Sequence, residues 1–279
     1  MAKGVHLAST GCLLPDEGEL PVPLALAARV DRAQALRYLG PGPDRGELPD
    51  SLNDILVAAE QWALSNIVPL GVHRTGLVCR DTTSAGGLLT RVLPAGSATC
   101  DGAWPVVPLE LPSVRLASLL VNSDRATLLA VTLGSVVDER IDQLSRDGRL
   151  AEAVVLDAVA SASAECAADE LCQTIAAEAA EVGKQLTRRF SPGYGDLPLA
   201  VQAKVLCWLG ASRIGLAVTP SSMLVPQKSV TAVAGWAPLA DGGDQRSHRR
   251  SCGACDIADC RYRDSDRPDR RSEVQKRES

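Results

Sequence analysis

The longest regular pattern in the chain runs from Arg149 to Leu186 and is that of an amphipathic helix. An unbroken helix of this length spans roughly 55–60 Å at a rise of 1.5 Å per residue. Its apolar residues recur at steps of three and four along most of the pattern, as expected for one buried stripe. They are Val155, Val159, Ala162, Cys166, Cys172, Ile175, Ala179, Val182 and Leu186. The fold must therefore accommodate one long helix with a buried face.

The region before this helix, from Val68 to Leu133, has the composition of a β-sheet. Short runs rich in Val, Leu and Thr alternate with Gly, Pro, Asn and Asp, which is typical of strands and turns. The predicted strands are Gly76–Cys79, Leu88–Leu93, Val114–Val121 and Ala126–Leu133. Asn122–Asp124 lies between the last two and predicts a hairpin connection.

Shorter helices are predicted on both sides of the sheet-forming region. Asp31 is an N-cap candidate for Asp31–Leu39, which ends before Gly40 and Pro41. Helical periodicity and end signals predict further helices over Ser51–Asn66, Ser135–Arg146 and Pro198–Leu209, and Ile214–Val218 and Ser229–Ala234 resemble strands. The sequence thus predicts a mixed chain, with a strand-rich middle and a helical second half.

Composition excludes several classes of protein. The net charge of −5 argues against a nucleic-acid binder, which would carry a basic face. No segment is long and apolar enough for a membrane span, and no signal peptide is evident, so we expect a cytoplasmic protein without membrane or nucleic-acid partners. Most of the nine cysteines are isolated, as expected for free thiols in a reducing compartment.

The segment from Arg189 to Gly195, Arg-Phe-Ser-Pro-Gly-Tyr-Gly, has the chemistry of a ligand-binding turn. Pro192 stops the preceding helix, and the two glycines allow backbone conformations that a Cβ would block. Arg189 offers a planar fork suited to a carboxylate, and Tyr194 an aromatic ring with a hydroxyl. Two interpretations fit these residues alone: a site for a ligand with an amino acid and an adenine, or a tight turn held by a stacked tyrosine.

A resemblance separates these interpretations. Arg-x-x-Pro-Gly-Tyr resembles the S-adenosylmethionine-binding motif of the activation domain of vitamin B12-dependent methionine synthase. The likeness extends over roughly residues 25–262 and matches the short, stand-alone branch of that family. Its other elements are Thr132-Leu133-Gly134, Glu165, Gln202, Ile214-Gly215, Thr219 and the run from Met223 to Val230.

The resemblance implies an α+β fold with a twisted, mainly antiparallel sheet flanked by helices. It also implies a division of the chain. Residues 1–24 form an N-terminal extension, residues 25–237 the S-adenosylmethionine-binding domain, and residues 238–279 a polar tail. Its composition predicts that the tail is mostly disordered, since it has few apolar residues to offset the entropy of ordering.

The same resemblance assigns the ligand contacts. Arg189 corresponds to the arginine that contacts the methionine portion of S-adenosylmethionine, and Ser191 and Gly193 to positions whose backbone lines the adenosine. Tyr194 is the motif tyrosine, and Glu165 corresponds to a helix glutamate that faces the ligand's ammonium group. No residue pair has the spacing of a nucleophile and its base, so no catalytic side chain is assigned.

Glu165 also has a simpler interpretation. It follows Asp157 and Ser161 at four-residue steps, so these side chains share one polar face of the long helix. A solvated helix face explains that pattern as well as a ligand role does.

The chain departs from the family in three places. Ser221-Ser222 replaces the aromatic residue expected before Pro226, and Asp196-Leu197-Pro198 replaces a cysteine-containing segment. The cobalamin-binding pattern Asp-x-His-x-x-Gly is absent. A partner must therefore supply the corrinoid.

Cys252, Cys255 and Cys260 place three thiols within nine residues of the tail, with His248 as the nearest imidazole. Such a cluster is suited to Zn²⁺ or an iron–sulfur centre, and the spacing does not choose between them. An unliganded cysteine patch is the remaining interpretation.

The leading hypothesis is an S-adenosylmethionine-binding module that supports reductive methylation, and thus reactivation, of cobalamin in a partner methionine synthase or related corrinoid methyltransferase. The resemblance implies a cobalamin-binding methyltransferase as partner and a flavodoxin or ferredoxin-type protein as electron donor. The alternatives are a non-catalytic partner of a corrinoid protein and a metal-cluster electron-transfer accessory protein.

Overall fold

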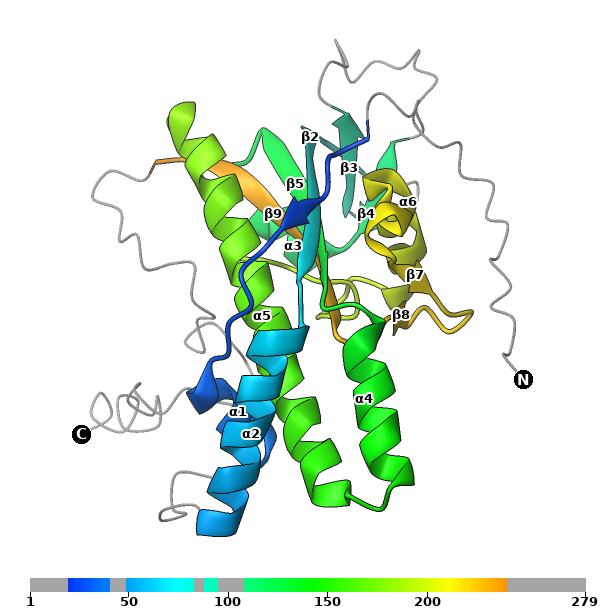
Figure 1. Cartoon of the computed structure of the whole chain (residues 1–279). Helices are drawn as coiled ribbons and strands as arrows, with labels where there is room; N and C mark the ends of the chain where they lie inside the picture. Colours follow the sequence, from blue (N-terminus) through cyan, green and yellow to red (C-terminus); the bar gives the residue numbers. More distant parts are fainter. Residues whose placement is uncertain (1–19, 41–48, 83–87, 95–107, 240–279) are drawn as a thin grey trace, which may run out of the picture.

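The computed structural model describes residues 20–40, 49–82, 88–94 and 108–239, and the account below concerns these residues (Figure 1). They form an α+β fold built on an antiparallel seven-stranded sheet with the order β4-β3-β2-β5-β9-β6, and with β1 paired to β2. The strands are β1 (Leu24–Ala25), β2 (Leu70–Thr82), β3 (Leu88–Pro94), β4 (Leu109–Pro112), β5 (Arg125–Thr132), β6 (Lys184–Leu186) and β9 (Ser229–Pro238). A separate hairpin joins β7 (Ala217–Val218) to β8 (Leu224–Val225).

Helices cover both faces of this sheet, which confirms the predicted fold class. They are α1 (Arg32–Tyr38), α2 (Asp50–Asn66), α3 (Val114–Leu119), α4 (Ser135–Arg146), α5 (Leu150–Glu181) and α6 (Gln202–Leu209). Asp31 caps α1 as predicted, since its carboxylate accepts a hydrogen bond from the Gln34 amide at 3.0 Å. The predicted boundaries of α2 and α4 are confirmed to within one residue.

The long helix α5 serves two parts of the molecule. Its N-terminal half packs with α1, α2 and α4 in a cluster rich in alanine, and its C-terminal half lies against the sheet (Figure 1). Leu171, Ile175 and Ala179 pack there on Leu129 of β5 and Ala232 of β9. The buried stripe that the sequence predicts thus serves both parts: Val155, Val159 and Ala162 pack among the helices, and Ile175 and Ala179 pack on the sheet. Val182, the next residue of the predicted stripe, is exposed.

The opposite face of the sheet is covered by α3 and α6. Because side chains alternate along a strand, the neighbours of Leu129 and Ala232 point to this second core. Leu128 and Val233 pack there with Leu116 of α3 and Leu206 of α6. β5 is therefore buried on both faces, which explains its continuous apolar sequence.

Val114–Val121, predicted as a strand, is instead largely the helix α3. Two caps outweigh the strand-like composition of its Val and Leu residues. The Ser113 hydroxyl accepts a hydrogen bond from the Leu116 amide at 2.9 Å, and the distant Asp196 carboxylate accepts one from the Val114 amide at 2.7 Å. The predicted hairpin at Asn122–Asp124 is consequently wrong, and β5 pairs with β2 and β9.

The long helix also ends earlier than its apolar pattern predicts. Helix α5 stops at Glu181, and Gly183 follows with a φ of +69°, a conformation that favours glycine. The next residues form β6, which pairs with the end of β9. Leu186 thus belongs to the sheet rather than to the helical stripe.

Ile214–Val218 is another prediction that is only partly right. The segment Ala211–Ile214 is a short 3₁₀ helix, and only Ala217–Val218 is extended.

None of the helices described is both long and apolar enough to cross a membrane. Cys166 and Cys172 are free thiols as predicted. The same prediction is wrong for Cys79 and Cys207, which are disulfide-bonded. The reducing compartment inferred from free thiols stays a prediction.

Candidate functional site

The site predicted from the sequence is joined to the sheet by an isolated backbone pair, between Phe190 and Val233. Phe190 and Val233 of β9 exchange both backbone hydrogen bonds, each 2.9 Å long. Phe190 therefore behaves as a strand residue, and its ring packs in the core on the α6 side together with Val233. Because side chains alternate in extended backbone, Arg189 projects to the other side, where α5 lies.

Ser191 to Tyr194 form a tight turn. The Tyr194 amide donates to the Ser191 carbonyl at 3.1 Å, and Gly193 has a φ of +87°. A proline followed by a glycine with φ near about +80° is the signature of a type II turn. Any residue with a Cβ would be strained at Gly193, so the backbone conformation alone explains the Pro-Gly pair of the motif.

Asp196 fixes this turn to helix α3. Its carboxylate accepts hydrogen bonds from the Ser113 hydroxyl and from the Val114 and Arg115 amides. Burial alone raises the pKa of Asp196, but these hydrogen bonds outweigh it and leave the pKa below its usual value. The residue that departs from the family pattern is therefore an anchor of the turn.

Gly195 lies against the same helix. A Cβ at this glycine would stand 2.9 Å from Cδ of Arg115 and 3.3 Å from the Phe190 ring. The φ of +56° favours a glycine here, and the absence of a side chain lets Arg115 of α3 lie directly against the turn.

Arg189 and Glu165 lie in contact. Nη2 of Arg189 donates to Oε2 of Glu165 at 3.3 Å and to Oδ1 of Asp169 at 2.5 Å. The Arg189 and Glu165 side chains are only 17% and 19% exposed. The structure thus places together an arginine and a glutamate that the sequence assigns to one ligand, although the chain separates them by 24 positions.

The other terminal nitrogen of Arg189 has no such partner. Nη1 is buried and makes no hydrogen bond. A buried donor without an acceptor costs about 1–3 kcal/mol, because its hydration is lost and nothing replaces it. The Arg189 guanidinium therefore has a hydrogen-bond donor that could still take an acceptor.

The remaining predicted contacts lie on the turn itself. Tyr194 is 65% exposed and Ser191 is half-buried, next to the buried Pro192. The structure therefore presents an aromatic ring to solvent at the turn that follows Arg189. An exposed ring of this size is available for stacking on a flat ligand.

A second cation contacts the same face of α5. Nζ of Lys228 lies 2.6 Å from Oδ1 of Asp157 and donates to the Ser161 hydroxyl at 3.0 Å. Four residues at four-residue steps on α5 thus hold two cations from distant segments. Asp157 and Ser161 contact Lys228, and Glu165 and Asp169 contact Arg189.

The segment before Lys228 is held by Gln202 of α6. Its side-chain amide donates to the Ser222 carbonyl at 3.1 Å, and its carbonyl oxygen accepts from Thr231 at 3.0 Å. Gln202, part of the family pattern, is therefore a buried brace between the β7–β8 hairpin and β9. The Ser221-Ser222 departure lies in this hairpin connection, where Ser222 has a φ of +64°.

Sequence reasoning missed Asp169, Asp196 and Lys228. Asp169 had a visible signal, because it continues the four-residue spacing of Asp157, Ser161 and Glu165. Nothing local to Asp196 or Lys228 predicts their partners, which lie at least 81 and 67 positions away.

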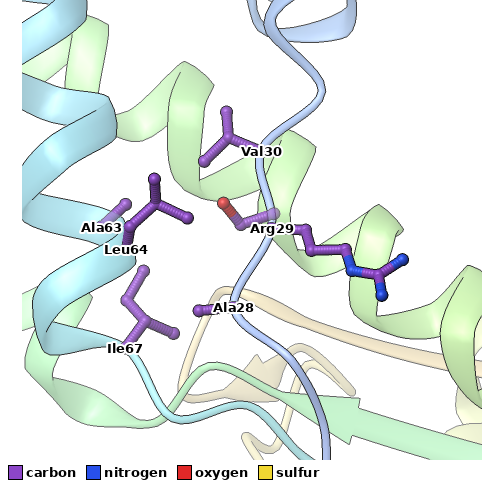
Figure 2. Close-up of a pocket in the computed structure, with 7 residues that line it drawn as sticks. Ala28, Arg29, Val30, Ala63, Leu64 and Ile67 are labelled. Carbon is purple, nitrogen blue, oxygen red and sulfur yellow. The ribbon is translucent and has the colours of Figure 1, made fainter.

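A small hollow lies elsewhere, between Ala28–Val30 and helix α2. It is partly open to solvent and is lined largely by apolar side chains (Figure 2). Figure 2 shows Val30, Leu64 and Ile67 around it, with the guanidinium of Arg29 pointing away. Small-molecule sites usually enclose about 300–1,000 Å³. This hollow has almost no room even for a water-sized sphere, so it is too small for S-adenosylmethionine.

The cysteine cluster of Cys252, Cys255 and Cys260 lies outside the described residues. Within those that are described, no three His, Cys, Asp or Glu side chains come together as a metal site. Metal binding by the tail therefore stays a prediction.

The sequence matches no protein-family model and no curated protein at a significant level. Among solved structures, it is similar to a crystal structure of the MetH reactivation domain bound to AdoHcy. The two share 15% sequence identity with a TM-score of 0.52, and the match covers 80% of this chain and 82% of the other. The chain has a reactivation-domain-like fold. At this identity the similarity concerns the fold, and the ligand of that domain is its own.

Proposed function

We propose that the chain binds S-adenosylmethionine at the face between helix α5 and the turn from Ser191 to Tyr194. Two findings support this proposal: the fold resembles a domain crystallised with AdoHcy, and Arg189 lies in contact with Glu165. The observation that carries it is Arg189, whose buried Nη1 lacks an acceptor beside a half-buried glutamate.

The charges at this face fit the amino-acid end of the ligand. S-adenosylmethionine and AdoHcy share a carboxylate, an ammonium group and an adenosine. In the proposed complex the carboxylate binds the Arg189 fork, and the ammonium group binds Glu165. The backbone of Ser191 and Gly193 lines the adenosine, and the exposed Tyr194 ring stacks at the rim.

The proposed role is to support reductive methylation of cobalamin held by a partner. S-adenosylmethionine supplies the methyl group, and the chain contributes by binding and orienting this donor and by excluding water. The partner is a cobalamin-binding methyltransferase, and a flavodoxin or ferredoxin-type protein supplies the electron. The spacing of the tail cysteines alone supports a Zn²⁺ or iron–sulfur site there. Metal analysis of the purified chain tests this part of the proposal.

The first experiment is calorimetric titration of the full chain with S-adenosylmethionine and, separately, with AdoHcy. Arg189→Ala should abolish binding of both ligands. The matched control is Arg188→Ala, because Arg188 is an exposed neighbour of the same charge and should leave the affinity unchanged. Absence of binding by the wild type at millimolar ligand would overturn the proposal and favour a non-catalytic partner of a corrinoid protein.

The second experiment adds a corrinoid methyltransferase that lacks its own activation domain, together with reduced flavodoxin. Wild-type chain and S-adenosylmethionine should convert oxidised cobalamin to methylcobalamin, followed by visible absorbance. Arg189→Ala should fail in the same assay while Arg188→Ala succeeds. Equal conversion with and without the wild-type chain would remove the reactivation role even if the ligand binds.

A further inference from the structure

Asp169 holds an unusual position in the network around Arg189. Both acidic partners of Arg189 bind the same nitrogen, Nη2, and Asp169 makes the shorter contact at 2.5 Å against 3.3 Å for Glu165. The second nitrogen, Nη1, is buried and unbonded. The guanidinium fork is thus half used, although its preferred carboxylate geometry engages two parallel N–H groups.

An incoming carboxylate would use the fork better than Asp169 does. It would accept from Nη1 and Nη2 together, which satisfies the buried donor and competes directly with Asp169 for Nη2. The exchange requires one resident acid to leave. Exposure decides which: the Asp169 side chain is 58% exposed and Glu165 only 19%. Asp169 is therefore the carboxylate that can move into solvent, while Glu165 stays in contact with Arg189.

We infer that Asp169 is an internal competitor for the carboxylate of the ligand: it occupies Arg189 in the free protein, leaves when the ligand binds, and thereby lowers the affinity. This inference rests on the proposed function, because it names a determinant of the same site. The apparent dissociation constant then equals the intrinsic one divided by the fraction of molecules in which Arg189 is available. Asp169 weakens binding without contacting the bound ligand.

The inference predicts that removing this carboxylate tightens binding, the opposite of what loss of a ligand contact would do. Asp169→Asn keeps the size of the side chain and removes its charge, and Asp169→Ala removes its hydrogen bond as well. Both should bind AdoHcy roughly three- to tenfold more tightly than the wild type. Because Asp169 is mostly exposed, both variants should fold, which circular dichroism verifies.

Two controls isolate the cause. The first is 5′-methylthioadenosine, which carries the adenosine but no carboxylate or ammonium group. Its affinity should be the same for the wild type and both Asp169 variants, since it does not compete at Arg189. The second is Glu181→Gln at the exposed end of α5, which makes the same change in net charge and should leave AdoHcy affinity unchanged.

The outcomes separate the inference from the function on which it rests. Tighter AdoHcy binding by the Asp169 variants alone, with 5′-methylthioadenosine unaffected, supports the inference. Equal or weaker AdoHcy binding by these variants overturns it and leaves the proposed function standing. Lack of AdoHcy binding by the wild type and by every Asp169 variant overturns both.

Discussion

Two cation clusters on one face of helix α5 look alike and differ in one respect. In each, a cation from a distant segment contacts two α5 residues four positions apart: Lys228 contacts Asp157 and Ser161, and Arg189 contacts Glu165 and Asp169. The lysine is 12% exposed and the arginine 17%, so burial does not distinguish them. The difference is that Arg189 has a buried donor without an acceptor.

This difference separates a structural contact from a binding group. Among the residues described, no buried polar atom of the Lys228 cluster lacks a partner. Lys228 also lies in the segment where Leu133 and β9 meet, since its carbonyl accepts from the Leu133 amide at 3.0 Å. We therefore expect Lys228 to contribute to stability and Arg189 to ligand binding, although both are cations against the same helix.

The largest expected effect is the stabilisation of the protein by its ligand. AdoHcy at one hundred times its dissociation constant should raise the free energy of unfolding of the wild type by about 2.7 kcal/mol. Lys228→Met at the same AdoHcy concentration should gain about as much, since Lys228 makes no contact with the ligand in the proposed complex. Arg189→Met should gain nothing at the wild-type concentration. Urea denaturation with and without AdoHcy measures these differences. If AdoHcy stabilised Arg189→Met as much as the wild type, Arg189 would not be a binding group and the contrast with Lys228 would be wrong.

Without ligand the expected changes in the free energy of unfolding are smaller, and Lys228→Met should be the more affected variant. Lys228→Met should lower the free energy of unfolding by about 1–2 kcal/mol, because it removes charged hydrogen bonds, and the exposure of Asp157 at 53% limits the loss. Arg189→Met should cost less, since it also removes the unbonded Nη1. Urea denaturation of the free proteins tests the order. If Arg189→Met proved the more destabilising, the arginine would have to be counted as structural.

The smallest effect concerns the pKa of the Cys172 thiol, on which the charge of Arg189 acts. Burial raises the pKa of Cys172 to about 11, and the positive charge of Arg189 partly opposes this increase. Arg189→Met should therefore raise the pKa further and slow alkylation of Cys172 at alkaline pH. Lys228→Met should leave the rate unchanged.

The measurement is the pH dependence of iodoacetamide labelling, read at Cys172 by peptide mass spectrometry. Because the thiolate is the reactive form, labelling should rise with pH toward the pKa in every variant, displaced upward in Arg189→Met. A downward displacement would mean that Arg189 does not act on the thiol through its charge.

The sequence predicts local structure well where caps and periodicity agree. The N-cap at Asp31 and the limits of α2 and α4 follow from residues next to one another. It fails at Val114–Leu119, because a strand-like composition is overridden by Asp196, whose role no neighbouring residue predicts. It also fails at Leu186, where pairing with Trp236 of β9 takes the residue out of the helical stripe.

The candidate site divides in the same way. The Pro-Gly pair predicts the turn, and the resemblance selects Arg189 and Glu165 as neighbours. The contact of Arg189 with Asp169 depends on the pairing of Phe190 with β9, which directs Arg189 toward α5 and is a property of the whole fold. The sequence therefore names the groups of the site but leaves out their arrangement in the absence of ligand.

The anchoring of the turn by Asp196 has a consequence for the order of folding. Ser113 and Asp196 are 83 positions apart, and the chain between them includes β5, α4, α5 and β6. Contacts of such high contact order form only after the intervening chain has been arranged. We therefore expect the motif to acquire its shape late, so that recovery of ligand affinity during refolding follows the slow pairing of β5 with its neighbours rather than the fast formation of helices.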